Sequence, residues 1–568
     1  MTTSTQQNNG NVLLLTSVFG PFGVDDEYGE ASNRMELFHN QVTREQGVFS
    51  YRFNHNSFGL YFLAENVRVP STVLDFPSLD QFTEEIKKGY DYVGISFIVP
   101  NFAKAKKMTE LIRQHAPNTK IILGGHGVSV PDLAQHISYD HSCRGDGIGF
   151  MRELFNEDPH EPVRHPLVPG SSAKQIMGVD LPLNTGIVVP GVGCANKCRF
   201  CATSHFFCEY TAFLPTGQDI FDVCCRYEDE RGVTDFSIMD ENFLKMKDRA
   251  LELIALMEKH KRYFTFSIFS SAETLRELGE LDLLIRLGVQ FIWIGIESKK
   301  EVYLKNKGTD FTELFAQLKR RGIPVLASAI LFLEHHDKET IHEDIEFAVS
   351  LKPDYLQFME LGPMPGTALH DDYRDKNLLL EDVPFKEQHG QDKIWFRHEH
   401  FTRDETAHYL RYAFKTDYKR NGASLMRIIE TGLMGYEYTL YHADPLVRAR
   451  AASYKPQAEK SRNMLYAASL LKENETTGEI ITRVKPMFRR LFGPVTMKTR
   501  LLSTMVVGLA LKEKALMKFT KNTKQPKMHR QLFNQGAEIQ VPLVVEEPVT
   551  ASRELSTPKV ATAMEATN

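Results

Sequence analysis

The sequence has few cysteines, no long apolar run and little excess charge of either sign. Its seven cysteines among 568 residues are too few for a disulfide framework and suit a reducing compartment. No apolar stretch reaches the roughly 20 residues that a helix needs to cross a bilayer, and residues 1–10 lack the apolar core of a secretory signal. A formal net charge of −5 argues against a surface that binds nucleic acid throughout. We therefore expect a cytoplasmic protein that does not bind nucleic acid.

The overall composition is that of a globular protein, with 42% hydrophobic and 25% charged residues. The chain is too long for one ordinary domain, and three domains are a fair expectation. Residues 156–183 carry five prolines, and we predict a linker there. Changes in the pattern of apolar and polar residues predict five further segments, namely 11–155, 184–370, 371–480, 481–535 and 536–568.

Three of the seven cysteines lie close together in the sequence. Cys194, Cys198 and Cys201 form a C-x3-C-x2-C pattern after the apolar run 185–190, which we predict to be a buried strand. Thiolates are the ligands of iron–sulfur clusters, and three of them can each hold one iron of a cubane [4Fe-4S] cluster. The fourth iron would stay open to another ligand, as chemistry at a metal requires. The alternatives are isolated thiols or a structural zinc completed by His205 or Cys208.

The cysteine spacing, with Phe200 before the last cysteine, resembles that of the radical S-adenosylmethionine (SAM) family. The resemblance implies that the open iron chelates the amino and carboxylate groups of SAM. One electron from the cluster then cleaves SAM to a 5′-deoxyadenosyl radical. The electron would come from a donor such as flavodoxin or ferredoxin.

Residues 11–155 alternate apolar runs with amphipathic stretches. This pattern predicts strands at 11–16, 71–77, 91–97 and 120–125, with helices at 57–67 and 103–115. Alternating strands and helices indicate a doubly wound parallel sheet, which binds ligands beyond the carboxyl ends of its strands. Small or polar residues at those ends allow a ligand to approach the backbone closely, namely Ser96, Gly124, Gly125 and His126.

The order of these pieces resembles a Rossmann-like cobalamin-binding domain that precedes the barrel in one radical SAM subfamily. The matching stretches are residues 58–64, 93–96, 123–126 and 144–147. The D-x-H-x-x-G signature is absent from this region, which implies a base-off corrinoid without a lower histidine ligand. The alternative is a Rossmann-like domain that binds nothing. Residues 17–54 form an unusually long connection, and we predict a lid or substrate loop there.

Residues 184–370 repeat the order of strand and helix, and their six β/α units match the partial barrel of the radical SAM family. Functional groups of such barrels lie at the carboxyl ends of the strands. Two segments at predicted strand ends resemble SAM contacts of the family, Asp240-Glu241 and Glu297-Ser298. A carboxylate suits SAM, which carries a sulfonium and an ammonium group. The alternative is that these acids are ordinary solvated residues at strand ends.

Catalytic residues are not fixed by the sequence, but three candidates stand out. His335 and His336 follow the predicted fifth strand, and histidine titrates near neutrality. A solvated loop is the alternative for both histidines. Cys208 could supply a thiol hydrogen.

The C-terminal third is predicted to be helical from 402 to 471, and relatives carry here a helical region that covers the barrel mouth. Residues 481–530 contain thirteen Lys or Arg and a single acid, Glu513. An apolar run at 501–511 lies between these basic residues, which suits contact with an anionic membrane at the inner face. The alternative is a helix packed on the protein with a solvated basic face. Residues from 541 onward are predicted to be disordered.

Together these features predict an α/β protein with a Rossmann-like cobalamin-binding domain, a radical SAM partial (β/α)6 barrel and a helical C-terminal region. The implied cofactors are a [4Fe-4S] cluster, SAM and cobalamin. The implied reaction is methylation of an unactivated carbon of a small-molecule or lipid-like substrate. Oxidative cyclisation, as in anaerobic tetrapyrrole cyclases, is an alternative, and a corrinoid or iron–sulfur carrier is another. A transfer-RNA methylthiotransferase is disfavoured because residues 11–155 offer only Cys143 as a cluster ligand.

Overall fold

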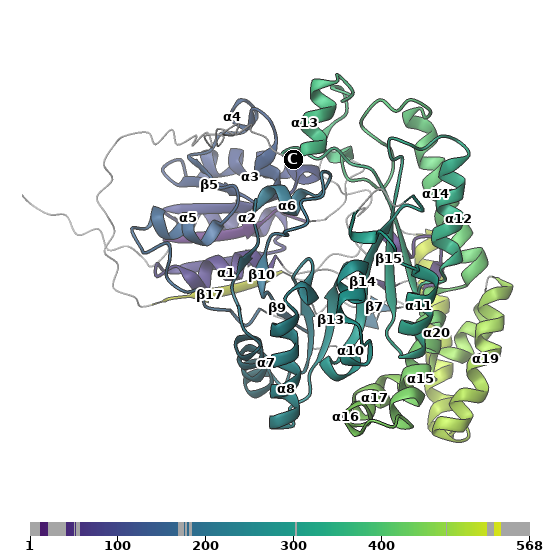
Figure 1. Ribbon diagram of the computed structural model, residues 1–568. Coiled ribbons are helices and arrows are strands. Elements are labelled where there is room, and N and C mark those ends of the chain that lie inside the picture. Colours follow the sequence, from purple (N-terminus) through teal and green to yellow (C-terminus); the bar gives the residue numbers. More distant parts are fainter. Residues whose placement is uncertain are drawn as a thin grey trace, which may run out of the picture. The chain divides into compact units, whose positions relative to one another are not determined.

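The computed structural model describes residues 12–20, 41–49, 51–52, 57–168, 175–176, 179–180, 185–300, 304–472, 474–519 and 528–535 (Figure 1). All of them belong to one compact unit, residues 1–537. Two six-stranded, mainly parallel sheets, two small sheets and a set of helices make up this unit. The predicted α/β class is therefore confirmed. The predicted tail beyond residue 541 lies outside the described residues.

The first sheet has six strands in the order β17-β3-β1-β4-β5-β6. Strands β3, β1, β4, β5 and β6 are parallel, as the alternation of strands and helices predicted. The strands are β1 (Leu13–Ser17), β3 (Ser71–Asp75), β4 (Tyr92–Ser96), β5 (Lys120–Gly124), β6 (His141–Ser142) and β17 (His529–Phe533). The helices include α1 (Phe58–Asn66), α2 (Leu79–Ile86), α3 (Phe102–His115) and α5 (Gly147–Leu154).

The edge strand β17 comes from the far end of the chain and was not predicted. It pairs antiparallel with β3, so that Phe533 lies opposite Ser71. Phe533 is 9% exposed and packs in the same core as Tyr61 of α1. The segment 481–535 therefore ends in a strand of the first sheet.

The second sheet has six parallel strands in the order β16-β15-β14-β13-β12-β9. No pairing joins β9 to β16 in the described part of the chain, so the barrel is open, as predicted. Its strands are β9 (Thr185–Val188), β12 (Asp235–Ile238), β13 (Thr265–Phe269), β14 (Val289–Glu297), β15 (Val325–Leu331) and β16 (Tyr355–Glu360). Its helices are α7 (Gly217–Arg231), α8 (Lys247–His260), α9 (Ala272–Leu278), α10 (Asp282–Leu287), α11 (Phe311–Arg320) and α12 (Thr340–Ser350).

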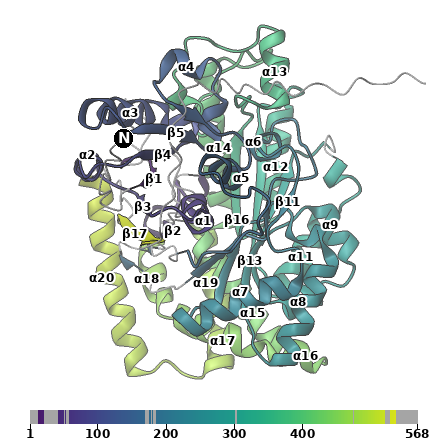
Figure 2. The same ribbon diagram turned by 90° about the vertical axis from the view of Figure 1, so that its left-hand side faces the viewer.

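The C-terminal helices pack beside the barrel (Figure 2). Helix α14 (Arg403–Asn421) contacts β16 and α12, and α15 (Ser424–Leu440) contacts α11, α17 (Ala451–Ser461) and α19 (Glu475–Phe492). Helix α20 (Met497–Phe519) contacts α18 (Met464–Leu471). The loop before α14 contributes His389, Gly390 and Trp395 to the cavity at the carboxyl ends of the barrel strands, and that the helical region covers the barrel mouth stays a prediction. No helix in the described part of the chain has the length and apolar character that a membrane span requires.

Part of the long connection at 17–54 runs into the barrel. Val42 is 1% exposed and packs against Leu326 and Tyr355. The Gln41 Oε1 atom accepts a hydrogen bond of 3.0 Å from Gln357 Nε2. Residues 41–49 are therefore a buried packing segment and not the predicted lid. Residues 21–40, 50, 53 and 54 of the predicted loop lie outside the described residues.

Candidate functional site

The three cysteines lie on the loop between the short strand β10 (Gly191–Val192) and the short helix α6 (Ala202–Phe206). Gly193 begins this loop with a φ of 87°, a backbone region that glycine adopts without strain. A Cβ at this position would lie 2.0 Å from the backbone oxygen of Glu209. Gly193 is thus required both for its conformation and for the close approach of the neighbouring chain.

Arg199 anchors the cysteine loop to the opposite edge of the open barrel, where the fifth and sixth strands lie. Its Nη1 donates to Glu334 Oε1 at 2.9 Å, and its Nη2 donates to Asp372 Oδ2 at 2.6 Å. Its backbone oxygen accepts a bond of 2.9 Å from the Leu369 N–H. The loop after the first barrel strand is therefore tied to segments that follow the fifth and sixth strands.

The free thiols of Cys194, Cys198 and Cys201 line one cavity of about 430 Å³, together with Phe200. Burial raises the pKa of the Cys194 and Cys198 thiols, while the Lys305 ammonium opposes this increase. The three sulfur atoms do not form a group compact enough to bind a single metal ion together. Among the described residues, such a compact group is formed by His335, His336 and Asp344. A cubane cluster separates its ligands, because each thiolate binds a different iron. This arrangement fits a cluster better than a zinc ion.

The candidate fourth zinc ligands do not join this cavity. Neither His205 nor Cys208 is among its lining residues. Cys208 is exposed, and its thiol lies 3.7 Å from the backbone oxygen of His205. Cys208 lines neither this cavity nor a second cavity, which extends beside it to the carboxyl ends of β4 and β5. The structure therefore does not bring this predicted hydrogen donor to the site.

Glu297 reaches the cysteine cavity through an irregular strand end. The pairing of β14 with β15 shifts register between Gly295 and Glu297, and Glu297 has a φ of 58°. Its carboxylate folds back over Gly295, where an added Cβ would lie 2.2 Å from Glu297 Oε1. Lys305 Nζ contacts this oxygen at 2.5 Å. Burial lowers the pKa of Lys305, but Glu297 and the cysteines outweigh burial and raise it.

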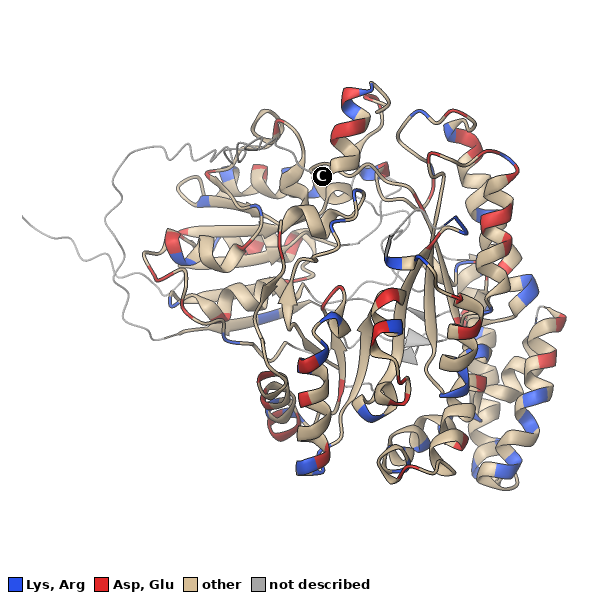
Figure 3. Ribbon diagram, in the orientation of Figure 1, with Lys and Arg blue, Asp and Glu red and all other residues tan. Residues whose placement is uncertain are grey.

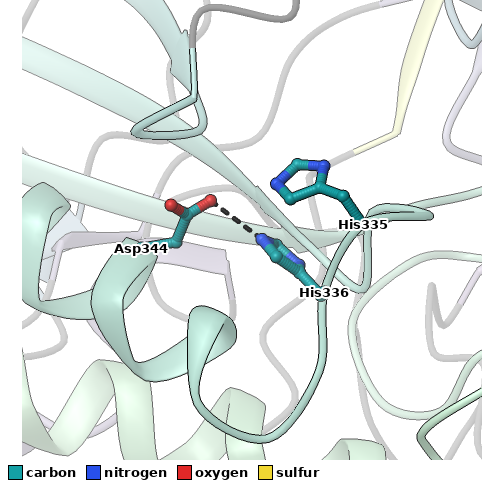
Figure 4. A group of neighbouring side chains, drawn as sticks. All are labelled: His335, His336 and Asp344. Atoms are coloured by element: carbon teal, nitrogen blue, oxygen red, sulfur yellow. Dashed lines mark hydrogen bonds and ion pairs between the residues drawn. The ribbon is translucent and has the colours of Figure 1, made fainter.

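Ser298 belongs to a polar network with the two predicted histidines; Figure 4 shows these histidines with Asp344. The Ser298 Oγ lies 3.4 Å from His335 Nε2. His336 accepts a bond from the Leu333 N–H at Nδ1, and its Nε2 lies 2.8 Å from Asp344 Oδ2. His336 is fully buried, so both of its ring nitrogens are already used. None of these four polar side chains lines the cysteine cavity.

The two histidines therefore support the loop that follows β14. Asp344 Oδ1 accepts a bond of 3.0 Å from the Lys299 N–H, and this bond fixes the chain just after Ser298. Burial and the neighbouring His336 lower the pKa of His335 to about 4. His335 is thus neutral at physiological pH.

Asp240 is held in a buried ion pair, and it lines not the cysteine cavity but the cavity beside it. Its Oδ2 contacts Arg249 Nη2 at 2.7 Å, where both side chains are almost fully buried. The same oxygen accepts a bond of 2.7 Å from the Tyr210 hydroxyl, and Oδ1 accepts one from the Asn242 N–H. Asp240 therefore holds the strand end that carries Glu241.

Glu241 and Phe269 line the cysteine cavity and also a second cavity of about 480 Å³. Desolvation by the surrounding protein raises the pKa of Glu241, and the Asp240 carboxylate adds to this increase. The second cavity extends to the carboxyl ends of β4 and β5. Its lining includes all four predicted residues at these ends, namely Ser96, Gly124, Gly125 and His126.

The wall of the second cavity contains several glycines and a buried histidine nitrogen that has no hydrogen-bond partner among the described residues. A Cβ on Gly59 or Gly124 would meet nothing within 4 Å, so these positions leave open space. The His126 ring stacks on Phe206 with centroids 4.6 Å apart, and its buried Nε2 has no partner in the described part of the chain. Burial lowers the pKa of His126, which keeps the ring neutral.

Sequence reasoning missed two groups that line these cavities. Lys305 faces the cysteines, and Cys143 lines the second cavity, where burial and Asp146 raise its pKa to about 12. Lys305 falls in a charged stretch that is typical of a solvated loop. Its contact with Glu297 and its place in the cavity are three-dimensional features for which the sequence carries no signal.

Comparisons with known proteins agree with this geometry. Residues 188–348 match the model of the radical SAM superfamily. An anaerobic magnesium-protoporphyrin IX monomethyl ester cyclase of Rubrivivax gelatinosus is 23% identical over 73% of this chain and 83% of its own length. A bacteriochlorophyllide d C-8(2)-methyltransferase of Chlorobaculum tepidum is 24% identical over 34% of this chain and 45% of its own length.

A solved structure shares the fold. It is that of TsrM from Kitasatospora setae, a radical SAM methyltransferase with tryptophan substrate and a SAM analogue bound. The TM-score is 0.50 at 14% identity, and the match covers 80% of this chain and all of that one. The superfamily match spans the cysteine loop and the four barrel strands β12, β13, β14 and β15. The chain therefore contains a radical SAM domain and is similar to a methyltransferase and a cyclase.

Proposed function

We propose that this enzyme is cobalamin-dependent and methylates an unactivated carbon of a small hydrophobic or lipid-like substrate. The junction of the two cavities carries the proposal, since Glu241 and Phe269 line both. When bound, a cluster with SAM supplies a carbon-centred radical, and a corrinoid supplies a methyl group. A substrate carbon that has lost a hydrogen atom has three bonds and an unpaired electron. The group that donates the methyl must therefore lie beside this carbon. Two adjoining cavities meet this requirement.

The residues of the first cavity fit a cluster and SAM. Cys194, Cys198 and Cys201 are the thiolate ligands, and Phe200 packs beside them. Glu241 and Glu297 offer carboxylates for the ammonium or hydroxyl groups of SAM. The electron donor is proposed to be a small redox protein such as flavodoxin or ferredoxin.

The residues of the second cavity fit a corrinoid. A flat macrocycle needs close backbone approach, which Gly59 and Gly124 allow. His126 offers an unpaired neutral nitrogen, and Ser96 offers a hydroxyl. The remaining lining is largely apolar, including Leu63 and Phe213, which suits the face of a large ring.

Oxidative ring closure is a second candidate. It is favoured by the cyclase relative, whose similarity extends over 73% of this chain, compared with 34% for the methyltransferase. Both reactions would begin with removal of a hydrogen atom from the substrate. The mass of the product separates them, because methylation adds one CH₂ unit and ring closure does not.

Anaerobic reconstitution with iron, sulfide and cobalamin tests the proposal. The loaded protein is incubated with SAM and dithionite, and the products are separated by chromatography. Bound corrinoid together with 5′-deoxyadenosine and S-adenosylhomocysteine is the expected result. Cleavage of SAM by a protein that retains no corrinoid would overturn the cobalamin part of the proposal and leave the radical chemistry.

A surface on α20 supports a lipid-like substrate. Met497, Leu501 and Met505 are 58–77% exposed and recur every four residues, so they form one apolar stripe. Lys498 and Arg500 are exposed beside the stripe, and Figure 3 shows further basic residues along α19 and α20. Apolar side chains flanked by basic residues suit an anionic membrane surface. We therefore propose peripheral membrane contact through this helix.

Sedimentation with phospholipid vesicles tests the membrane contact. We expect binding to vesicles that contain phosphatidylglycerol, weaker binding at high salt, and none to pure phosphatidylcholine. Replacing both Leu501 and Met505 with serine should abolish binding. The matched control is Tyr441→Ser, which removes an apolar side chain that is 72% exposed elsewhere. Equal binding of the double variant and the native protein would refute the contact.

A further inference from the structure

Lys305 is the one lysine or arginine among the described residues that line the cysteine cavity. It lies in the short helix η6 (Leu304–Asn306) after β14, and its side chain is only 18% exposed. Removing an ammonium from water is costly unless a partner compensates. A buried lysine beside three thiols therefore requires an explanation.

The partner that holds Lys305 is Glu297, whose side chain is 7% exposed. Their contact of 2.5 Å keeps the ammonium both charged and fixed in place. Lys305 lines the same cavity as Cys194, Cys198 and Cys201. The three thiols and the ammonium therefore share one enclosed space, and the charge of Lys305 acts over a short distance on whatever the thiols hold.

We infer that Lys305 is a positioning residue that presents a fixed positive charge to an iron–sulfur cluster on Cys194, Cys198 and Cys201, and that Glu297 holds it there. The inference rests on the proposed function, because it needs the cluster. During reduction the cluster takes one electron from the reductant and gains one negative charge. A fixed cation stabilises the reduced form more than the oxidised form, and it thereby raises the reduction potential.

The structural alternative is that the ion pair only shapes the strand end. The register shift at Gly295 and the φ of 58° at Glu297 are both held by local contacts that include Lys305. In that case removal of the lysine would loosen the loop but leave the cluster potential unchanged. A second alternative is that Lys305 binds the SAM carboxylate. The potential measured without SAM separates both alternatives from the inference.

The test is a redox titration of the reconstituted full-length protein without SAM, followed by the electron paramagnetic resonance signal of the reduced cluster. Lys305→Met removes the charge and keeps the length of the side chain. We expect the equilibrium constant for one-electron reduction to fall about tenfold, which is a decrease of about 59 mV in the midpoint potential. Lys305→Arg retains the charge and should stay close to the native midpoint.

Lys299→Met is the matched control. Lys299 is near in sequence and also pairs with a glutamate, but its side chain is 53% exposed and does not line the cavity. Its removal should not move the midpoint. A Lys305→Met protein with a full cluster and a native midpoint would overturn the inference, even if its affinity for SAM were weaker. A native protein that takes up no cluster would remove the proposed function as well.

Lys305→Gln supplies a second test if Lys305→Met does not fold or load iron. It removes the charge but keeps a side chain that can hydrogen-bond to Glu297, so the midpoint should fall as in Lys305→Met. An unchanged or higher midpoint would contradict the inference. If neither Lys305→Met nor Lys305→Arg loads iron, the lysine serves packing and not charge, and the inference falls.

Discussion

Gly295 controls where the Glu297 carboxylate lies. An alanine there would place its Cβ 2.2 Å from Glu297 Oε1 and 3.1 Å from Lys305 Nζ. We predict that Gly295→Ala displaces the carboxylate and weakens SAM binding about tenfold, the loss of one charge-assisted hydrogen bond. Isothermal titration of the reconstituted protein with SAM measures this.

The iron content of Gly295→Ala should stay native, because the cysteine loop is not touched. Gly432→Ala is the control, since an added Cβ there meets nothing within 4 Å and the position lies inside α15. Native SAM affinity in Gly295→Ala would mean that Glu297 does not contact SAM.

The sequence revealed which residues carry chemistry but not how they are paired. The spacing of the cysteines and the position of Glu297 after an apolar run are local features, and the structure brings them into one cavity. Asp240 also follows an apolar run, but its carboxylate is engaged in an ion pair with Arg249. Lys305 pairs with Glu297, which lies at a strand irregularity. Such pairings depend on three-dimensional contacts that residue type and spacing do not encode.

At the scale of elements, β17 is held to the first sheet by an ion pair. Arg530 Nη2 lies 2.8 Å from Glu85 Oε1, and the Tyr90 hydroxyl donates to the same oxygen at 2.7 Å. Burial raises the pKa of Glu85, but hydrogen bonds from Arg530, Lys88 and Tyr90 outweigh burial and lower it to about 2. The charged carboxylate is therefore stabilised by the folded state.

This pair predicts an acid-sensitive attachment of β17. The folded pKa of Glu85 is below the value of 4.5 expected when unfolded. Its stabilisation is thus complete above about pH 4.5 and is lost as the pH falls toward about 2. Arg530→Met should lower stability by about 1 kcal/mol at neutral pH and by less at about pH 3. Thermal unfolding at both pH values measures the difference.

Lys87→Met is the control for this prediction. Lys87 pairs with Glu84, but both side chains are largely exposed, so we expect little change at either pH. An equal loss of stability in Arg530→Met at both pH values would show that β17 is held by packing and not by the ion pair.

Helices and strands with strong local patterns were predicted well, and their boundaries often agree. The pattern of residues 217–231 is typical of a helix, and helix α7 spans Gly217–Arg231. The pattern of residues 275–287 is typical of a single helix, but the structure has two, α9 and α10, and Gly279 lies between them with a φ of 81°. Strand β17 has an ordinary strand pattern, but its partner lies more than 450 residues earlier. Local patterns can suggest a strand but do not identify a distant partner.

At the scale of the whole molecule, the first sheet and the barrel share one core. Leu13 and Leu15 of β1 pack in the same cluster as Ile187 and Val189 from the first barrel strand and the residue after it. The buried segment 41–49 adds a second connection, because Gln46 Nε2 donates to Ser424 Oγ at 3.0 Å. We therefore predict that the first sheet, the barrel and α15 unfold in one cooperative transition.

The two tryptophans of the sequence make this prediction measurable. Trp293 lies on β14, and Trp395 borders the same barrel cavity, so fluorescence reports on the barrel alone. Leu14 is fully buried on the other face of the first sheet, in a cluster that contains no barrel strand. Leu14→Ala should cost about 2–5 kcal/mol and lower the urea midpoint by the same amount in fluorescence and circular dichroism.

Leu470→Ala provides the control, because Leu470 is 56% exposed and its removal should shift neither midpoint appreciably. If the barrel unfolded independently, the fluorescence transition of Leu14→Ala would match that of the native protein, while circular dichroism would show an earlier step. Independent unfolding would also imply that the two cavities can separate. Cooperative unfolding would instead mean that Glu241 and Phe269 border both cavities for as long as the chain is folded, and the proposed transfer between the cavities depends on this.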